Sequence, residues 1–269
     1  MPTRHRLVPP PDRGAVRFTL GTVTREPVEV DAAQVRALLT EGEVEVLGRI
    51  PWASNATLLA EVRHDGHAGL AVYKPERGER PLWDFPPGLY RREVAAYVVS
   101  EALGWELVPA TVVRDGPLGV GSLQLFVEFR PDTTAFELVE NGHPAMRRMA
   151  AFDAVINNAD RKGGHALLDP GGHVWAIDHG VCFHHEPKLR TVIWDYAAEP
   201  IPEDILTDLD RLRGELRGED PGSEDLAVAL DGLLDPLERD ALSGRVEELV
   251  DRGVFPEPRS AHPFPWPPV

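Results

Sequence analysis

The chain has 269 residues, of which 42% are hydrophobic and 27% are charged, and it carries a net charge of −16. These proportions are ordinary for a globular protein with one large domain or two lobes. No apolar run reaches the ~18 residues of a transmembrane helix. Residues 1–11 lack the apolar core of a signal peptide, and the single cysteine, Cys182, excludes an internal disulfide. We therefore expect a cytoplasmic protein without integral membrane contact.

The negative charge narrows the range of partners. With 28 basic and 44 acidic side chains, most of the surface should repel nucleic acid and anionic membranes. The pairs Arg91–Arg92 and Arg147–Arg148 could form a local basic patch, but the simpler interpretation places them on solvated helix surfaces. We expect no nucleic-acid partner, and a lipid partner is disfavoured.

The first half of the chain predicts an antiparallel sheet with two helices. Helical spacing indicates helices at 31–42, where Asp31 is the expected N-cap, and at 89–103. Alternating apolar residues bounded by turn residues predict strands at 15–24 (weakly), 44–50, 57–63, 69–74, 111–114 and 123–130.

The second half predicts a mainly helical region. Residues 144–158 have an apolar stripe that Asp153 interrupts, so this acid needs partners, and the loop that follows is the natural place for them. Further helices are expected at 203–217, 225–234 and 236–252. The proline-rich residues 253–269 either pack on the domain or recruit a partner.

Two aspartates lie on either side of a short predicted hairpin. Leu167 and Leu168 end one apolar run, the turn 169–172 follows, and residues 174–177 form the next run. Because a hairpin brings its ends together, Asp160 and Asp178 should be neighbours in space. Paired carboxylates suit a divalent metal and a nucleophile that must lose a proton.

The spacing of these residues resembles a known superfamily. Residues 160–165, Asp-Arg-Lys-Gly-Gly-His, match the first two fixed positions of the Asp-x-Lys-x-x-Asn catalytic loop of protein-kinase-like enzymes. Residues 177–180, Ile-Asp-His-Gly, resemble the metal-binding Asp-x-Gly of the same enzymes. Residues 152–161 look most like the phosphatidylinositol 3/4-kinase-like branch, especially its type II phosphatidylinositol 4-kinases, and more distantly like HipA-type bacterial kinases. The whole chain also resembles an actinobacterial family of kinase-like proteins.

The resemblance implies a bilobal α+β fold with an antiparallel β small lobe and a mainly helical large lobe. It assigns residues 1–43 to an N-terminal extension, 44–130 to a small nucleotide-binding lobe, 131–252 to a large catalytic lobe and 253–269 to a Pro-rich tail. The implied activity is ATP-dependent phosphoryl transfer. The acceptor is left open, and we expect a protein or a small molecule rather than a lipid.

The resemblance also implies roles for the motif residues. Asp160 would orient the attacking group or accept its proton, and Lys162 would stabilise charge on the transferred phosphoryl group. Asp178 would bind the metal, Mg²⁺ or Mn²⁺, that bridges the phosphates.

The nucleotide-binding residues are expected in the first half. Lys74, at the end of the strand 69–74, would hold the α- and β-phosphates, and a helix glutamate would orient it. Glu93 is the candidate, and Glu101 is the rival at the far end of the same helix. Ser54 and Asn55 lie where a phosphate-covering loop is expected, although an ordinary hairpin turn explains them equally well.

One motif position departs from the pattern. His165 replaces the asparagine whose carbonyl oxygen would ligate a second metal. Magnesium prefers oxygen ligands, whereas imidazole suits manganese or zinc. His165 therefore indicates an altered metal preference, a one-metal mechanism or lost turnover.

Two alternatives to a kinase stay open. The first is a kinase-fold protein that transfers a nucleotidyl group or only binds nucleotide. The second is a zinc protein, suggested by six side chains within 21 positions, although their spacing matches no common zinc motif. These are His165, His173, His179, Cys182, His184 and His185.

Overall fold

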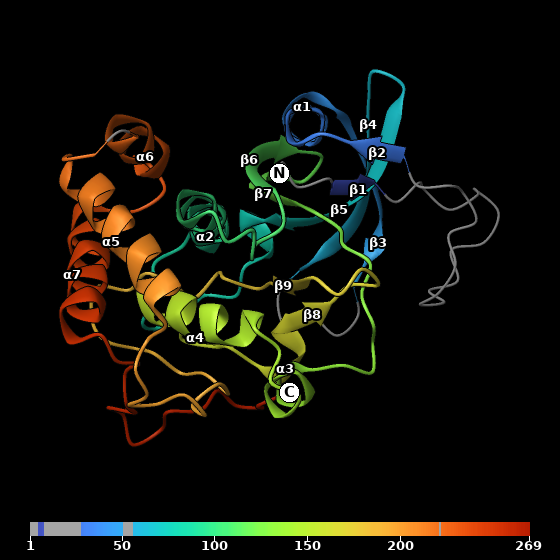
Figure 1. Ribbon diagram of the computed structural model, residues 1–269. Helices are drawn as coiled ribbons and strands as arrows, with labels where there is room; N and C mark the ends of the chain where they lie inside the picture. The colour runs from blue at the N-terminus through green and yellow to red at the C-terminus, as the bar shows by residue number, and fades with distance from the viewer. Residues whose placement is uncertain (1–4, 8–27, 51–55, 221) are drawn as a thin grey trace. The chain divides into compact units, whose positions relative to one another are not determined.

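The computed structural model describes residues 5–7, 28–50, 56–220 and 222–269, which form two compact units (Figure 1). Unit 1 comprises Met1–Val94 and Pro109–Pro131, and unit 2 comprises Ala95–Val108 and Asp132–Val269. The division falls within helix α2 (Leu89–Leu103). The strand predicted at 15–24 lies outside the described residues.

A five-stranded antiparallel sheet forms the centre of unit 1, with the strand order β3-β4-β5-β7-β6 (Figure 1). The strands are β3 (Glu43–Arg49), β4 (Leu58–His64), β5 (His67–Pro75), β6 (Thr111–Gly116) and β7 (Gly119–Leu125). The antiparallel sheet predicted from the sequence is therefore confirmed.

Strand β7 begins and ends earlier than the predicted strand 123–130. Its first half contains Gly119 and Gly121, which lower the β propensity of the sequence and hide the strand. Gly121 is needed where β7 approaches β5, because a Cβ atom there would lie 2.3 Å from the carbonyl oxygen of Lys74. The strand thus depends on close backbone packing, which a propensity pattern does not report.

Helix α1 (Ala32–Glu41) covers part of this sheet. It begins at Asp31, whose carboxylate accepts a hydrogen bond from the Gln34 N–H at 2.8 Å, as the predicted N-cap requires. Its buried residues Val35, Leu38 and Leu39 supply the apolar face, and the helix contacts β4, β6 and β7. A further short sheet pairs β1 (His5–Leu7) with β2 (Val28–Val30).

Unit 2 is mainly helical, as predicted. Its elements after α2 are α3 (Ala135–Glu140), α4 (Ala145–Val155), α5 (Glu203–Arg217), α6 (Ser223–Leu230), α7 (Pro236–Arg252) and the antiparallel hairpin β8 (Ala166–Leu168) and β9 (Val174–Ala176). Helix α3 was not predicted. In Figure 1, α5, α6 and α7 lie beside one another, and α5 contacts both of the others.

Helix α4 runs through the core of unit 2. Met146, Met149, Phe152 and Ile156, which form the predicted apolar stripe, are all completely buried. Asp153 is also completely buried, in the middle of that stripe. Among the described residues, no helix has both the length and the apolar character needed to cross a membrane.

Candidate functional site

In unit 1, strand β5 and helix α2 place Lys74 against Glu93. Along β5, Tyr73 points into the core and Lys74 to the opposite, partly exposed face, as strand alternation requires. The Lys74 ammonium forms an ion pair with the Glu93 carboxylate, and the Glu93 side chain is only 4% exposed. The partner of Lys74 is thus Glu93, the predicted glutamate of this helix.

Two other expectations in unit 1 have different outcomes. The pair Arg91–Arg92 was interpreted as solvated helix surface, but Arg92 is buried, and its guanidinium lies 5.5 Å from the centre of the Phe85 ring. The face of the aromatic ring carries partial negative charge and attracts the guanidinium, and a count of charged residues cannot reveal such a contact. Ser54 and Asn55 lie outside the described residues.

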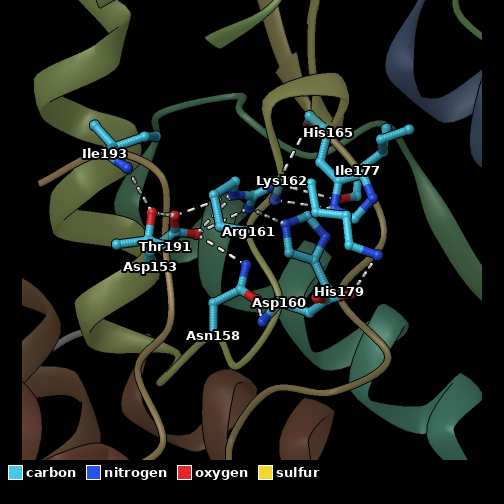
Figure 2. A network of polar contacts seen from close by, with 10 residues as sticks. All are labelled: Asp153, Asn158, Asp160, Arg161, Lys162, His165, Ile177, His179, Thr191 and Ile193. Atoms are coloured by element: carbon cyan, nitrogen blue, oxygen red, sulfur yellow. Dashed lines mark hydrogen bonds and ion pairs between the residues drawn. The ribbon is translucent and has the colours of Figure 1, made fainter. Parts of the chain in front are cut away.

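In unit 2, the buried side chain of Arg161 forms the centre of a polar network (Figure 2). Its Nε atom lies 3.0 Å from each carboxylate oxygen of Asp153, and an Nη2–Oδ1 distance of 2.9 Å completes a two-pronged ion pair. Both side chains are completely inaccessible to water. Asp153 also accepts hydrogen bonds from Asn158 at 3.0 Å and from Thr191 at 3.3 Å. The prediction that Asp153 finds its partners in the catalytic loop is confirmed.

The other side of Arg161 holds the hairpin against the loop. Its Nη1 atom donates to the carbonyl oxygens of His165 and Ile177, at 3.2 and 3.0 Å. Its Nη2 atom lies 2.8 Å from His179 Nε2. Because a guanidinium can only donate, His179 must accept at Nε2 and carry its ring proton on Nδ1. In Figure 2 Arg161 therefore lies between Asp153 on one side and the residues that flank Asp178 on the other.

The segment after the hairpin is also hydrogen-bonded to the loop that contains Asp160. The Arg161 N–H donates a hydrogen bond to the Arg190 carbonyl at 3.1 Å. The Val192 N–H donates to the Arg161 carbonyl, also at 3.1 Å. The Arg190 N–H donates to the Asn158 carbonyl at 2.9 Å. Asn158 in turn accepts the Asp160 N–H at 2.9 Å through its side chain. The backbone of Asp160 is thus fixed from both sides.

The Pro-rich residues at the end of the chain pack on the same region. The Pro263 carbonyl accepts the Thr191 N–H at 3.1 Å and the Trp194 indole N–H at 3.1 Å. The Pro268 carbonyl accepts the Gly163 N–H at 2.8 Å. Prolines lack an N–H but keep a strong acceptor, so this segment can cap donors of the loop. Of the two expectations for this segment, packing on the domain is observed.

Asp160 and Lys162 are paired. Lys162 Nζ lies 3.1 Å from Asp160 Oδ2, and both side chains are partly exposed. Burial raises the pKa of Asp160, the positive charge and hydrogen bond of Lys162 oppose that rise, and the negative charge of Asp178 adds to it. The charge of Asp178 therefore influences Asp160, as expected if the hairpin brings the two carboxylates near each other.

His165 immediately precedes β8, and Asp178 follows β9. The two side chains lie next to each other. Asp178 is a non-glycine residue with φ of +63°, a conformation uncommon for such residues and frequent at functional sites. Its Oδ2 atom lies 3.5 Å from His165 Nε2. The Lys162 N–H donates to His165 Nδ1 at 3.5 Å, so the neutral ring would direct its Nε2 proton towards Asp178.

The other histidines of this region take part in the fold. His173 Nε2 lies 2.9 Å from the Glu106 carbonyl oxygen, and His184 Nδ1 accepts the Glu186 N–H at 3.0 Å. The ring of His184 stacks on that of His185. Within the part of the chain that the structure describes, no three or more His, Cys, Asp or Glu side chains are grouped to hold a metal ion.

The positioning residues Arg161 and Asn158 were missed as functional residues. Arg161 occupies the variable position of the Asp-x-Lys motif, so the motif assigns it no role. A signal was present, because a lone acid inside an apolar stripe requires a buried cation nearby, and Arg161 lies eight positions after Asp153.

Comparison with known proteins agrees with this geometry. Residues 88–208 match the Phosphatidylinositol 3- and 4-kinase family. Fam20 from hydra, solved with sugar, shares the fold with a TM-score of 0.52 and 15% identity, over 82% of this chain and 87% of that one. The proinflammatory kinase CtkA from Helicobacter pylori gives a TM-score of 0.46 and 13% identity, over 81% of this chain and 94% of that one. The likeness to Fam20 concerns the fold, and the predicted α+β kinase-like fold is confirmed.

A sequence relative places the chain more closely. Protein Rv2133c from Mycobacterium tuberculosis is 43% identical over 267 residues, which cover 86% of this chain and 94% of the relative. The chain belongs to the family of this mycobacterial protein, and its residues 88–208 are similar to the phosphatidylinositol 3- and 4-kinase family. The predicted resemblance is confirmed.

The first prediction concerns the buried ion pair. Asp153→Asn keeps the size of the side chain but leaves Arg161 buried without a carboxylate, so unfolding in urea should show a loss of about 3–5 kcal/mol. Asp204→Asn, the matched control, breaks an exposed pair with Arg148 and should cost less than about 1 kcal/mol. Equal losses for the two variants would contradict the structural role of the network.

The second prediction concerns the ionisation of Asp160. Its raised pKa means that the folded state holds this proton more tightly than the unfolded chain, so the contribution to stability is present at low pH and is lost as the pH rises through the folded pKa. Lys162→Met should raise the pKa further, and Asp178→Asn should lower it. Carboxyl chemical shifts followed by NMR titration would show this, and shifts in the same direction for both variants would refute the assignment.

Proposed function

We propose that the protein is an ATP- and metal-dependent phosphotransferase that acts on a protein or small-molecule acceptor in the cytoplasm. The observation that carries the proposal is the ion pair between Lys74 and Glu93. A lysine held by a helix glutamate is the arrangement that protein kinases use to fix the nucleotide phosphates. Lys74 precedes the family match at residues 88–208, so its pairing with Glu93 is independent support.

The unit 2 residues suit the other half of the reaction. Asp160, backed by Lys162 at 3.1 Å, would orient the acceptor hydroxyl and take its proton, and its raised pKa makes it a better base than an ordinary carboxylate. Lys162 would neutralise charge on the phosphoryl group in transit. Phosphoryl transfer asks the protein mainly for such positioning and charge neutralisation.

The carboxylates fit a divalent metal. Asp178, with a side chain 46% exposed, offers hard oxygen ligands, and magnesium is held by one or two carboxylates together with substrate phosphates. A divalent metal held by Asp178 would supply positive charge that offsets the charge of the substrate phosphates. We assign Asp178 as its ligand, with His165 as a second candidate that favours manganese.

The acceptor is proposed from charge. The net charge of −16 disfavours approach to an anionic membrane, so a lipid headgroup in a bilayer is the least suitable acceptor despite the family relationship. A hydroxyl group on a protein or a small molecule does not require the protein to approach a negatively charged membrane.

A second candidate function follows from the position of His165. If Nε2 keeps its proton and donates to Asp178, neither ring nitrogen is available to a second metal. The protein would then use one metal, or it would bind nucleotide or transfer a nucleotidyl group without ordinary kinase turnover.

The third prediction tests the nucleotide residues. Lys74→Met should weaken binding of Mg–ATP at least tenfold in isothermal titration calorimetry, because a charge-assisted hydrogen bond to phosphate is lost. Glu93→Gln should weaken it less, since the lysine remains. Arg36→Gln, which removes an exposed cation on α1, serves as the control. Wild-type affinity in Lys74→Met would argue against the proposed nucleotide site.

The fourth prediction tests the metal. Wild type should release γ-phosphate faster with Mn²⁺ than with Mg²⁺. His165→Asn, which restores a carbonyl oxygen, should shift the Mn²⁺/Mg²⁺ ratio of turnover roughly tenfold towards Mg²⁺. An unchanged ratio in an active variant would remove His165 from the metal site and favour its role as a donor to Asp178.

A further inference from the structure

A cavity of about 350 Å³ lies within unit 2, between the segment that follows the Asp178 hairpin, helix α7 and residues 254–260. Its lining is rich in cationic side chains, namely Lys188, Arg190, Arg245, Arg252 and Arg259. Two carboxylates, Glu248 and Glu257, also line it. Such an excess of positive charge is unusual in a chain with a net charge of −16.

Arg245 reaches the cavity with one nitrogen still unsatisfied. Its Nε atom donates to the Val155 carbonyl at 2.8 Å, where α4 ends, and Nη1 lies 3.4 Å from the His184 carbonyl oxygen. Nη2 is buried and finds no acceptor among the described residues. Burial lowers the pKa of Arg245 to about 10. A buried donor without an acceptor costs free energy, and the positive charge of Arg245, which lines the cavity, favours an anion there.

The other cationic side chains of the cavity differ in how closely carboxylates approach them. Glu248 accepts from Arg252 at 3.0 Å and also pairs with Arg259, so one carboxylate serves both. Lys188 lies 3.8 Å from Glu186. Within the described ranges, no carboxylate forms an ion pair with Arg190. Burial and then the charges of Lys188 and His185 lower the pKa of the nearby His184, and Glu186 opposes this shift.

We propose that this cavity binds a small phosphate-bearing anion, held by Lys188, Arg190 and Arg245, none of which is assigned to phosphoryl transfer. Guanidinium groups match the geometry of phosphate oxygens, and three cations suit a dianion better than a single carboxylate. The volume accommodates a small molecule, and Trp194 and Leu249 line the cavity with apolar surface for its carbon frame.

The position of Arg190 connects this site to the catalytic loop. Its backbone N–H donates to Asn158, and its carbonyl oxygen accepts from Arg161. The backbone of Arg190 is therefore hydrogen-bonded directly to the loop that contains Asp160. A ligand that fixes the Arg190 side chain would restrain this part of the loop. The binding itself does not depend on the proposed phosphotransferase function.

The test is isothermal titration of two probes, inorganic phosphate and glucose 6-phosphate, at constant ionic strength. Wild type should bind at least one probe saturably, and Lys74→Met should bind it equally, which separates this cavity from the nucleotide site. The double variant Lys188→Gln/Arg190→Gln should bind at least tenfold more weakly. Arg239→Gln, on α7 and outside the cavity, should match wild type.

The two probes distinguish the sources of the phosphate. Equal affinities for the two probes would show that free phosphate is sufficient for binding. Tighter binding of glucose 6-phosphate would show that the site prefers a phosphorylated small molecule. If thermal melting shows the double variant to be unfolded, Arg190→Gln alone gives the comparison. The proposal is overturned if neither probe binds wild type saturably, or if a folded variant lacking Arg190 binds as wild type does.

Discussion

The buried ion pair between Asp153 and Arg161 is the interaction on which the candidate site depends. Two fully buried charges are costly to desolvate, and such a pair persists only when the remaining donors and acceptors are also satisfied. Here the guanidinium reaches a carboxylate, two carbonyl oxygens and an imidazole nitrogen. A lysine could not make these contacts, because it lacks the planar fork of donors.

The arrangement joins three segments that are distant in the sequence. Asp153 lies on α4, the two carbonyl groups belong to the residues that flank the β8–β9 hairpin, and Thr191 comes from the segment beyond it. This fixed frame explains how Asp178 can keep a positive φ angle, since strained backbone persists only where the surroundings determine it. It also explains how Asp160 and Lys162 can lie paired and partly exposed on either side of the completely buried Arg161.

Much of this arrangement was predictable from local sequence. The apolar stripe of α4 has helical spacing, the Asp31 cap precedes its helix, and Lys74 stands at the end of an alternating strand followed by a helix with Glu93. These features depend on residues close in sequence or on a superfamily motif. The pairing of Lys74 with Glu93 followed from the motif, because a separation of 19 positions gives no local signal.

The features that escaped prediction depend on packing between distant residues. Strand β7 begins at Gly119, which has φ of +97°, and contains Gly121, which the close approach of β5 requires. Arg92 is buried and lies over the ring of Phe85, and Arg161 pairs with a carboxylate on helix α4. The cationic cavity likewise assembles from side chains that are scattered along the last 80 or so residues, and the overall negative charge conceals it.

The most direct test of the account compares transfer of label from γ-labelled and α-labelled ATP by wild type and by Asp178→Ala, with Mg²⁺ and with Mn²⁺. A phosphotransferase predicts that γ-label alone is transferred to an acceptor or released, by wild type alone. Transfer of α-label would instead identify a nucleotidyltransferase. Absence of turnover with both labels and both metals, in the presence of protein and small-molecule hydroxyl acceptors, would contradict the proposed activity and leave a nucleotide-binding protein.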